Sequence, residues 1–577
     1  MDRNTRIGFG LILLLLIIWS VWMARYQPAQ RPAPGAEKQA SEQPAATSEP
    51  APEAPAPSAQ VAPAAPAGPR QFVVVETDRA RYLLDSWGAQ LRRIELLDYA
   101  GVGSEHVELL AAAHGDTAAA LGVELELPAG TFASGSAAFT LVNPPAGGRL
   151  RIRGDEQGAL EFRLQDGQGG SLVKRFQFHG DSYDIGLAVE ADLQGGFGQA
   201  QAIVLDWSVG LAPTEKNRKD DLSSFQSVYR VGDQQEKKSL RNFRGEAPAL
   251  RSEEGTLQWV ATKSKYFLAA LVPNTLQNGN ALLVGDHGAE RLGWRARFAL
   301  GGNRTRYAEE FQVYAGPLLF ETLKAHGRGL EHLVDMGTLI RPISLAIKWL
   351  MDFLSRFIPN YGLNIILLSI FTKVLFYRLT HKSLKSMKDM QAIQPELKSL
   401  QDKYKSDRER LNREMLALYK RAGVNPLSGC LPLLLQMPVF FALYRVLRGA
   451  VELRGAGFML WIDDLSNMDV IYALPFAIPL LGGFIDNAIS VLPILMGVSV
   501  WVQQKLGGSG LGMGAESPQA AQMAILNKIM PVFMTFVFYR MPSGLVLYWL
   551  VNNILQAAQQ YYIHKGLDKP RVVSAGA

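Results

Sequence analysis

The sequence predicts a multi-domain membrane protein, in which a bundle of six membrane-spanning α-helices carries a separate antiparallel β-sandwich domain. Three observations predict this class. The 577-residue chain is 48% hydrophobic, and its apolar residues are concentrated in the first 25 residues and after about residue 340. Several of these apolar runs approach the length of about 20 residues that a helix needs to cross a bilayer. Between them, short runs of alternating apolar and polar residues are separated by Gly, Asp and Pro.

The N-terminus begins with a basic segment that is followed by an apolar run. Arg3 and Arg6 precede residues 7–23, and no A-x-A cleavage site follows this run. A cleaved signal peptide, which is the alternative, has a shorter apolar core and small residues at the cleavage site. We therefore expect residues 1–26 to form a signal-anchor helix with its N-terminus in the cytoplasm. Residues 27–70 are rich in Pro and Ala and are expected to form a disordered tether.

Residues 71–330 have the pattern of a soluble β domain. Runs such as FVVVETD, LEFRLQ and YDIGLAVEADL alternate apolar and polar residues, which is typical of antiparallel strands in a sandwich. The sequence contains no H-E-x-x-H, Walker A or G-x-S-x-G motif. The domain is therefore expected to fold or dock without catalysis, and we predict no enzyme, cofactor or metal site. The one cysteine, Cys430, excludes an internal disulfide.

The apolar period becomes helical near residue 341. In residues 341–358, apolar side chains recur at three- and four-residue steps, while Lys348, Asp352 and Arg356 fall largely on the other side. A basic polar face together with a tryptophan is typical of a helix that lies in the membrane interface. The alternative is an ordinary helix that packs on the soluble domain.

Five further apolar stretches in the C-terminal part are predicted to cross the bilayer. The loops between them differ in charge: residues 378–421 hold 12 Lys and Arg against 6 Asp and Glu, and residues 445–490 hold 3 against 5. Since positive loops stay in the cytoplasm, the first loop is expected inside and the second outside, together with the β domain. The predicted spans are residues 361–379, 424–444, 491–506, 525–541 and 544–562.

The remaining segments complete this topology. Residues 471–486 contain two prolines and two glycines, and are expected to be an irregular or re-entrant part of the outer loop 445–490. Residues 507–524 and the tail 563–577 are expected to be cytoplasmic. With the N-terminal anchor, the chain then has six spans and both termini in the cytoplasm.

Residues 380–422 are expected to form a basic helical hairpin in the cytoplasm. Apolar residues recur at helical spacing on both sides of a break near residues 405–408. The alternative is a solvated charged linker. The charge fits anionic lipid headgroups, ribosomal RNA or acidic protein segments. The basic residues that we assign to such contacts are Lys385, Lys388, Lys398, Lys403, Arg408 and Arg413.

The most unusual residue is Lys373, near the middle of the predicted span 361–379. A lysine at the centre of a span costs roughly 2.5–3.5 kcal/mol on insertion scales. Ser369 lies one helical turn before it, on the same face. The predicted spans contain no Asp or Glu, so no ion pair within the bundle is expected. An unpaired cation in a water-filled cavity would attract an incoming negative charge.

Other polar residues are concentrated in the inner halves of the spans. They are Gln436 in the third span, and Asn552, Asn553 and Gln556 in the last. With Lys373, they predict a hydrated cavity that opens to the cytoplasm and is closed toward the outside. The alternative is dry helix–helix contact through Asn and Gln.

Two other functions are compatible with parts of this pattern. A secondary transporter or anion channel would also use an intramembrane lysine, although inverted repeats and intramembrane carboxylates are absent from the sequence. In a further hypothesis, the β domain is the active part and serves as a carbohydrate-binding or envelope-scaffolding module.

Four stretches of the C-terminal part resemble the YidC family of membrane protein insertases. They are GLNIILLSIFTKVLFYRLT, MLALYKRAGVNPLSGCLPLLLQMPVFFALYRVL, VELRGAGFMLWIDDLS and MPSGLVLYWLVNNILQAAQQ. The anchor, tether and β domain resemble the Gram-negative form, whose periplasmic domain is a β-supersandwich. The resemblance implies an inner-membrane insertase that receives nascent proteins with short translocated tails in a hydrophilic groove, alone or with the Sec translocon. It also implies recruitment of a ribosome or targeting factor by the hairpin and the C-terminal tail.

The resemblance implies roles for single residues as well. Lys373 aligns with the groove cation, which is usually Arg, and Ser369 with a position that is often Thr or Ser. Two features depart from the family: Lys lacks the fork of donors that Arg offers to a carboxylate, and Val537 replaces a Phe that some members have. The implied apolar contacts to the substrate are Cys430, Leu434, Met437, Phe440, Phe441, Phe533, Val537, Tyr548 and Trp549.

Overall fold

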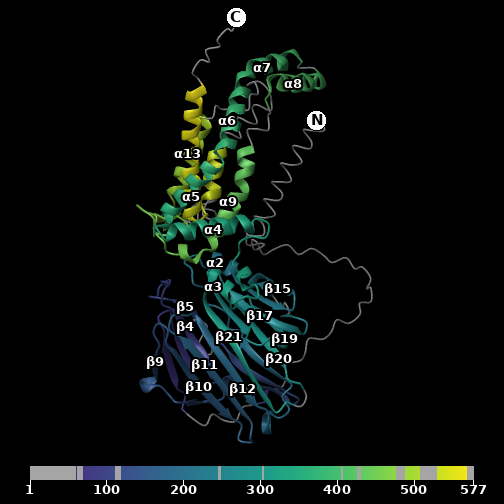
Figure 1. Cartoon of the computed structure of the whole chain (residues 1–577), viewed down its shortest axis with the longest axis vertical. Helices are drawn as coiled ribbons and strands as arrows, with labels where there is room; N and C mark the ends of the chain where they lie inside the picture. Colours follow the sequence, from purple (N-terminus) through teal and green to yellow (C-terminus); the bar gives the residue numbers. More distant parts are fainter. Residues whose placement is uncertain are drawn as a thin grey trace, which may run out of the picture. The chain divides into compact units, whose positions relative to one another are not determined.

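The computed structural model describes most of the chain and divides it into two compact units, residues 1–316 and 317–577 (Figure 1). The predicted anchor and nearly all of the predicted tether lie outside the described residues, as do the loop 507–524 and most of the stretch 471–486 and of the tail. The described residues are 60–61, 69–110, 119–244, 249–301, 304–404, 407–424, 431–475, 488–506 and 529–567.

The N-terminal unit consists mainly of two β-sheets, which confirms the prediction of a large β-rich domain. Most neighbouring strands pair antiparallel, and β1–β7 and β2–β9 pair parallel. The smaller sheet has the order β5 (Val107–Leu110), β4 (Gln90–Leu96), β3 (Ala80–Asp85), β2 (Phe72–Glu76) and β9 (Arg149–Arg151). The larger sheet follows the order β1 (Gln60–Val61), β7 (Gly130–Ala133), β6 (Gly122–Leu127), β13 (Ala202–Trp207), β20 (Arg291–Ala299), β19 (Asn278–Asp286), β17 (Gly255–Lys263), β18 (Phe267–Pro273), β21 (Arg306–Pro317), β12 (Asp184–Asp192), β11 (Ser171–His179), β10 (Gln157–Gln165) and β8 (Thr140–Val142), with β14 (Gln226–Val231), β15 (Gln234–Ser239) and β16 (Leu250–Arg251) beside it.

Burial along the strands follows their alternating sequence. In β11 and β12 every second residue is buried, because one face of each strand packs into the core. Strand β18 is buried along its whole length, as its continuous apolar sequence predicts. The indole rings of Trp207 and Trp294 stack in this core with their centroids 5.9 Å apart. One short helix, α2 (Arg218–Ser224), belongs to the same unit.

One lysine lies inside this core. Lys174 on β11 is fully buried, and its Nζ donates hydrogen bonds to the carbonyls of Gly88 at 3.2 Å, Ala89 at 2.5 Å and Leu121 at 2.5 Å. Ala89 and Leu121 have positive φ angles of 46° and 62°. Burial lowers the pKa of Lys174 to about 7. The lysine therefore joins β11 to the β3–β4 connection and to the start of β6.

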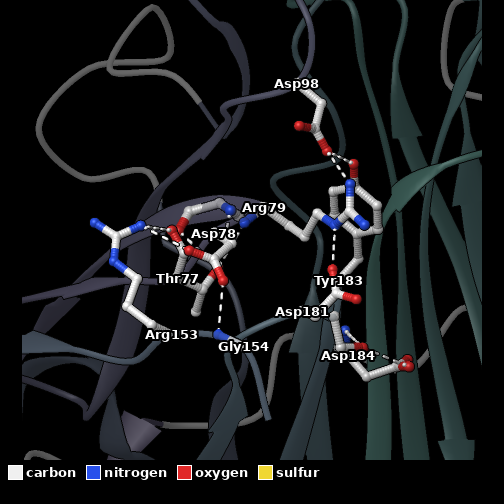
Figure 2. A network of polar contacts seen from close by, with 11 residues as sticks. Thr77, Asp78, Arg79, Asp98, Arg153, Gly154, Asp181, Tyr183 and Asp184 are labelled. Carbon is white, nitrogen blue, oxygen red and sulfur yellow. Dashed lines mark hydrogen bonds and ion pairs between the residues drawn. The ribbon is translucent and has the colours of Figure 1, made fainter. Parts of the chain in front are cut away.

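A polar network joins the smaller sheet to the larger one (Figure 2). Arg79, which precedes β3, donates hydrogen bonds to Asp98 at 3.1 Å and to Asp181 at 2.6 Å. The hydroxyl of Tyr183 donates to the same Asp98 at 2.7 Å. Because this network is largely exposed, we expect it to orient the sheets more than to stabilise them. Its second part joins Asp78 to the backbone of Gly154 at 2.7 Å and to the guanidinium of Arg153 at 2.9 Å.

The C-terminal unit is helical. Helix α13 packs against α5, α9 and α11, and α4 packs against α9. Within the ranges given above, no single helix combines the length and the apolar character of a membrane span, whereas the bent pair of α5 and the first part of α6 does so jointly. The elements are α3 (Phe320–Ala325), η6 (Leu330–Leu333), α4 (Arg341–Ser355), α5 (Tyr361–Leu375), α6 (Tyr377–Ala392), α7 (Gln394–Lys403), α8 (Arg408–Ala422), α9 (Leu431–Gly449), η8 (Val451–Leu453), β22 (Tyr472–Ala473), β23 (Ala488–Ile489), α11 (Leu492–Leu506), the helix Ile529–Phe538 and α13 (Ser543–Leu567).

The last strand of the β domain, β21, ends at Pro317, and the α3 and η6 segments follow it within the helical unit. The straight helix expected over residues 361–379 is bent by 62° between Leu375 and Tyr377. The sequence contains no Pro or Gly at this bend, which are the usual signals for a kink.

The predicted hairpin is present as α7 and α8. These helices pack against each other, and Leu397 and Leu418 are buried. Helix α6 is a separate element before them, because Pro395 starts a new helix in the first turn of α7. Residues 377–422 therefore form three helices, whereas two were expected for this region.

Helix α4 has the predicted amphipathic character. Lys348 is largely buried, and its Nζ lies 3.1 Å from Asp352 and 2.9 Å from Glu452 of η8. On the other side, the exposed rings of Trp349, Phe353 and Phe357 lie next to one another, with centroids 5.8 Å and 5.3 Å apart. The ion pairs attach the helix to its own unit, and the ring side remains uncovered within that unit.

A Lys348→Met variant is expected to loosen α4. The substitution leaves two carboxylates without their cation, so we expect local stability to fall by about 1–3 kcal/mol. Faster hydrogen–deuterium exchange of amides in residues 341–355 would show this loss. Arg356→Met is the matched control, because Arg356 is exposed; equal effects of both substitutions would contradict the assigned role of Lys348.

Candidate functional site

Lys373 lies beside a small pocket that is lined by side chains from α5, α6, α9 and α13. Its cavity volume is about 20 Å³, which is roughly the space of one water molecule. The bend after α5 places Lys373 in the last turn of that helix, where free carbonyl groups favour a positive charge. The lining residues are Thr372, Lys373, Phe376, Leu379, Thr380, Gln436, Val439, Tyr548, Asn552 and Gln556.

The partner of the lysine is neutral. The Nζ of Lys373 donates a hydrogen bond of 2.7 Å to Oε1 of Gln556, which comes from a residue 183 positions later in the chain. None of the side chains that line the pocket in the described part of the chain is a carboxylate. The positive charge of Lys373 is therefore not cancelled by a charge of opposite sign in this lining.

Tyr548 is the most deeply buried aromatic residue whose side chain lines the pocket in the described part of the chain. This residue is only 1% exposed, and the side chains of Thr372, Gln436 and Asn552 are its polar neighbours. Thr372 was not among the site residues predicted from the sequence. It lies three residues after Ser369, and this spacing places both on adjoining parts of one helix face, which is the signal that could have identified it.

Two of the predicted polar residues do not line the pocket. The hydroxyl of Ser369 is buried and donates to the carbonyl of Ile365 in its own helix at 2.9 Å. Nδ2 of Asn553 donates to Oγ of Ser499 on α11 at 2.9 Å. Asn553 thus makes a direct hydrogen bond between helices, as the alternative interpretation expects of Asn and Gln, whereas its neighbour Asn552 lines the pocket.

An aromatic cluster lies next to Tyr548 in the sequence. The ring of Trp549 lies 5.0 Å from that of Phe440 and 5.1 Å from that of Phe538, and Phe441 adjoins Phe440 at 5.5 Å. Phe538 was not among the contact residues predicted from the sequence. The cluster joins α9, α13 and the helix Ile529–Phe538 through apolar contacts.

The remaining predicted contact residues are distributed over the same helices. Phe533 is exposed, and Met437 and Val537 are partly exposed. Cys430 lies outside the described residues, and Leu434 belongs to α9 but its side chain is not among those described. In the hairpin region Lys385, Lys398, Lys403 and Arg413 are exposed, while the side chains of Lys388 and Arg408 are not among those described.

These features define a class of protein: a membrane protein with a large β-sheet domain and a helical unit that holds a cation in a polar pocket. Among the described residues no cluster of His, Cys, Asp and Glu could hold a metal ion. Residues 72–350 match the family model of the YidC periplasmic domain, and residues 353–570 match that of the 60Kd inner membrane protein.

The relatives of the chain are similar over nearly its whole length. The membrane protein insertase YidC of Chlorobium luteolum is 35% identical over 99% of this chain and 97% of its own, and that of Prosthecochloris aestuarii is 34% identical over 98% and 95%. A crystal structure of an active YidC insertase, with its first transmembrane domain resolved, covers 87% of this chain and 94% of its own with a TM-score of 0.36 and 20% identity. The chain belongs to the YidC family of membrane protein insertases. It is therefore an inner-membrane protein with a periplasmic domain that inserts proteins into the membrane and is not an enzyme.

Proposed function

We propose that the insertase receives the hydrophilic tail of a nascent membrane protein in the pocket around Lys373. The observation that carries this proposal is the neutral environment of the lysine: its amine bonds to the amide of Gln556, and no carboxylate lines the pocket in the described residues. A charge with low-dielectric walls around it attracts an incoming opposite charge. The pocket thus favours a client tail that carries a carboxylate.

Capture of the tail then exchanges one hydrogen bond for a stronger one. A hydrogen bond from an ammonium group to a carboxylate adds the attraction of two opposite charges, which the bond to a neutral amide lacks. A client carboxylate can therefore displace the Gln556 amide from Lys373. An ammonium group is a point charge and lacks the planar set of N–H donors with which Arg binds a carboxylate through two hydrogen bonds. We therefore propose that Lys373 holds the tail without fixing its orientation.

Release into the bilayer follows along the aromatic side of the bundle. Trp549, Phe440 and Phe538 form an aromatic cluster, in which Phe538 is buried and Phe440 and Trp549 are partly exposed. Phe533 is exposed on the same helix as Phe538. We propose that the apolar segment of the client slides over the exposed sides of these rings while its tail remains at Lys373. Ser369 and Asn553 support the helices and do not contact the client in this proposal.

The topology of the proposal follows from charge. We propose six spans with both termini in the cytoplasm, a β-sandwich arrangement of the periplasmic sheets, and α4 in the periplasmic membrane interface. The exposed cations of the α7–α8 region support contacts with anionic lipids and with a ribosome or targeting factor. Cooperation with the Sec translocon is proposed from the family resemblance.

Site-specific photocrosslinking tests the proposed path. A photoreactive amino acid at position 552 or 440 is expected to crosslink a stalled nascent chain with an acidic tail, because both positions line the path. Position 553 is the matched control, since Asn553 is the neighbour of Asn552 but contacts α11. Equal crosslinking from positions 552 and 553 would contradict the pocket.

A further inference from the structure

One loop of the helical unit lies over the ends of three helices. This segment, residues 458–469, is called the end loop here and connects the η8 region to β22. Its sequence, FMLWIDDLSNMD, contains three aspartates. Its contacts with α13, α11 and α5 all involve the first residues of these helices, where backbone N–H groups have no partner within the helix.

The end loop binds the start of α13 through its backbone. The N–H of Ser543 donates to the carbonyl of Asn467 at 2.7 Å, and the N–H of Gly544 donates to that of Leu465 at 3.0 Å. The hydroxyl of Ser543 donates to the carbonyl of Asp464 at 2.6 Å. The loop thus satisfies donors at the helix start that would otherwise bind water.

The carboxylate of Asp464 holds the loop in this conformation. One of its oxygens accepts hydrogen bonds from the N–H of Ser466 at 2.8 Å and from the hydroxyl of Ser466 at 2.7 Å. The other accepts from the amide of Asn467 at 2.7 Å. These bonds arrange the carbonyl groups that face α13.

A second carboxylate attaches the loop to α11. Oδ2 of Asp469 accepts a 2.6 Å hydrogen bond from the N–H of Leu492, the first residue of that helix. Asp469 is only 5% exposed, and its Oδ1 has no hydrogen-bond partner among the residues that the structure describes. A negative charge at a helix N-terminus is stabilised by the helix dipole.

The start of α5 completes the contact. A Cβ atom at Gly362 would lie 2.0 Å from the ring of Phe458, so only glycine allows this ring to lie against the helix. Nδ2 of Asn360, the N-cap of α5, donates to the carbonyl of Phe458 at 3.5 Å. The end loop therefore connects α5, α11 and α13 at one end of the bundle.

This end lies away from the pocket. Eleven residues separate Gly362 from Lys373, which is roughly 16 Å along a helix. Since the chain enters α5 from the periplasmic domain through α4, the proposed topology places the end loop on the periplasmic side and the pocket toward the cytoplasm.

We propose that the end loop is a seal that keeps the client groove closed on its periplasmic side, with Asp469 and Phe458 holding it shut. The proposal rests on the proposed function, because only a hydrated groove needs such a seal. With the loop displaced, the N–H groups at the starts of α11 and α13 would lose their partners in the loop and bind water, and the Phe458 ring would leave the start of α5, so a continuous water path across the unit could form. The seal thus allows a polar pocket in the membrane without a leak of protons.

Proton leak in vesicles tests the seal. Full-length protein is reconstituted into liposomes of synthetic phosphatidylethanolamine and phosphatidylglycerol, and the decay of an imposed pH gradient is followed with a trapped pH-sensitive dye. We expect Asp469→Ala and Gly362→Ala to leak about tenfold faster than the wild type, because loss of a charged hydrogen bond or of the ring contact shifts a closed–open equilibrium by about this factor. Asp469→Asn retains an acceptor for Leu492 and is expected to leak at an intermediate rate.

Asp463→Ala is the matched control, because Asp463 is an exposed aspartate of the same loop. Its vesicles are expected to be as tight as those of the wild type. Tight vesicles from Gly362→Ala or Asp469→Asn protein that still inserts a client would overturn the seal, and so would an equal leak from Asp463→Ala. If Asp469→Ala does not fold, the leak rates of Gly362→Ala and Asp469→Asn test the seal in its place.

Insertion assays separate this proposal from the proposed function. If a Lys373→Glu variant inserts an acidic-tailed client normally while Asp469→Ala vesicles leak, the pocket proposal fails and the seal stands. If Lys373→Glu blocks insertion while all loop variants stay tight, the pocket stands and the seal fails.

Discussion

A Lys373→Glu variant is expected to lose insertion of a client with an acidic tail, whereas Lys373→Arg is expected to preserve it. The substitution replaces the receiving cation with an anion. Among the described residues, no other charged side chain lines this pocket. Like charges repel strongly at low dielectric. A loss of about 1.4 kcal/mol in binding free energy already lowers the affinity for the client tail tenfold. The measurement is the protease-protected fraction of client in reconstituted vesicles.

The fold is expected to tolerate this change. The amide of Gln556, which now accepts a hydrogen bond from Lys373, can donate one to a carboxylate instead. Lys505→Glu is the matched control, because Lys505 is an exposed lysine in the last turn of α11 and is not part of the pocket lining. Unchanged insertion by Lys373→Glu, or an equal loss in Lys505→Glu, would remove the role given to Lys373.

A Lys174→Met variant is expected to destabilise the periplasmic domain by at least about 1–3 kcal/mol, since a buried acceptor that loses its donor costs about this much. Three buried carbonyls lose their common donor. Two of them belong to Ala89 and Leu121, whose positive φ angles are unfavourable without such support. Hydrogen exchange of amides in β10–β12 of the full-length protein measures the loss.

Lys237→Met is the control for this variant, because Lys237 lies exposed on β15 and surface substitutions usually change stability by less than about 0.5 kcal/mol.

The stability of the wild type is also expected to depend on pH. The folded protein holds the pKa of Lys174 at about 7, against 10.5 for a free lysine, so the unfolded chain binds an additional proton between these values. Wild-type stability therefore gains a contribution that rises between pH 7 and 10.5 by up to about 1.4 kcal/mol per pH unit. Lys174→Met lacks this rise, and equal pH profiles of the two proteins would contradict the buried amine.

The sequence predicted the parts of the protein that depend on local patterns. Alternating runs such as YDIGLAVEADL became strand β12 with every second residue buried, because a strand exposes its two faces in turn. The apolar spacing around Leu397 and Leu418 predicted helices whose buried faces meet. Lys373 was recognisable because a cation is rare in an apolar run.

The composition of the site was predictable only in part. Asn552 and Asn553 are identical neighbours in the sequence, yet one lines the pocket and the other binds Ser499. Their roles depend on how α13 is rotated against α5 and α11, and adjacent positions of a helix differ by about 100° around its axis. Phe538 was missed for the same reason, whereas the spacing of Thr372 from Ser369 could have identified Thr372.

By itself, the sequence determined that this protein has a β-rich domain, a helical unit and a lysine in an apolar stretch, because hydrophobic period and composition act over a few residues. Only the tertiary structure decided that α5 bends after Leu375, that Gln556 is the partner of Lys373, and that Lys174 joins three carbonyls in the core. The contacts of the end loop were also decided only by the tertiary structure, since they join the loop to residues 360–362, 492 and 543–544. These contacts connect residues that are far apart in the chain, so their geometry is set by how whole elements pack and not by the local sequence.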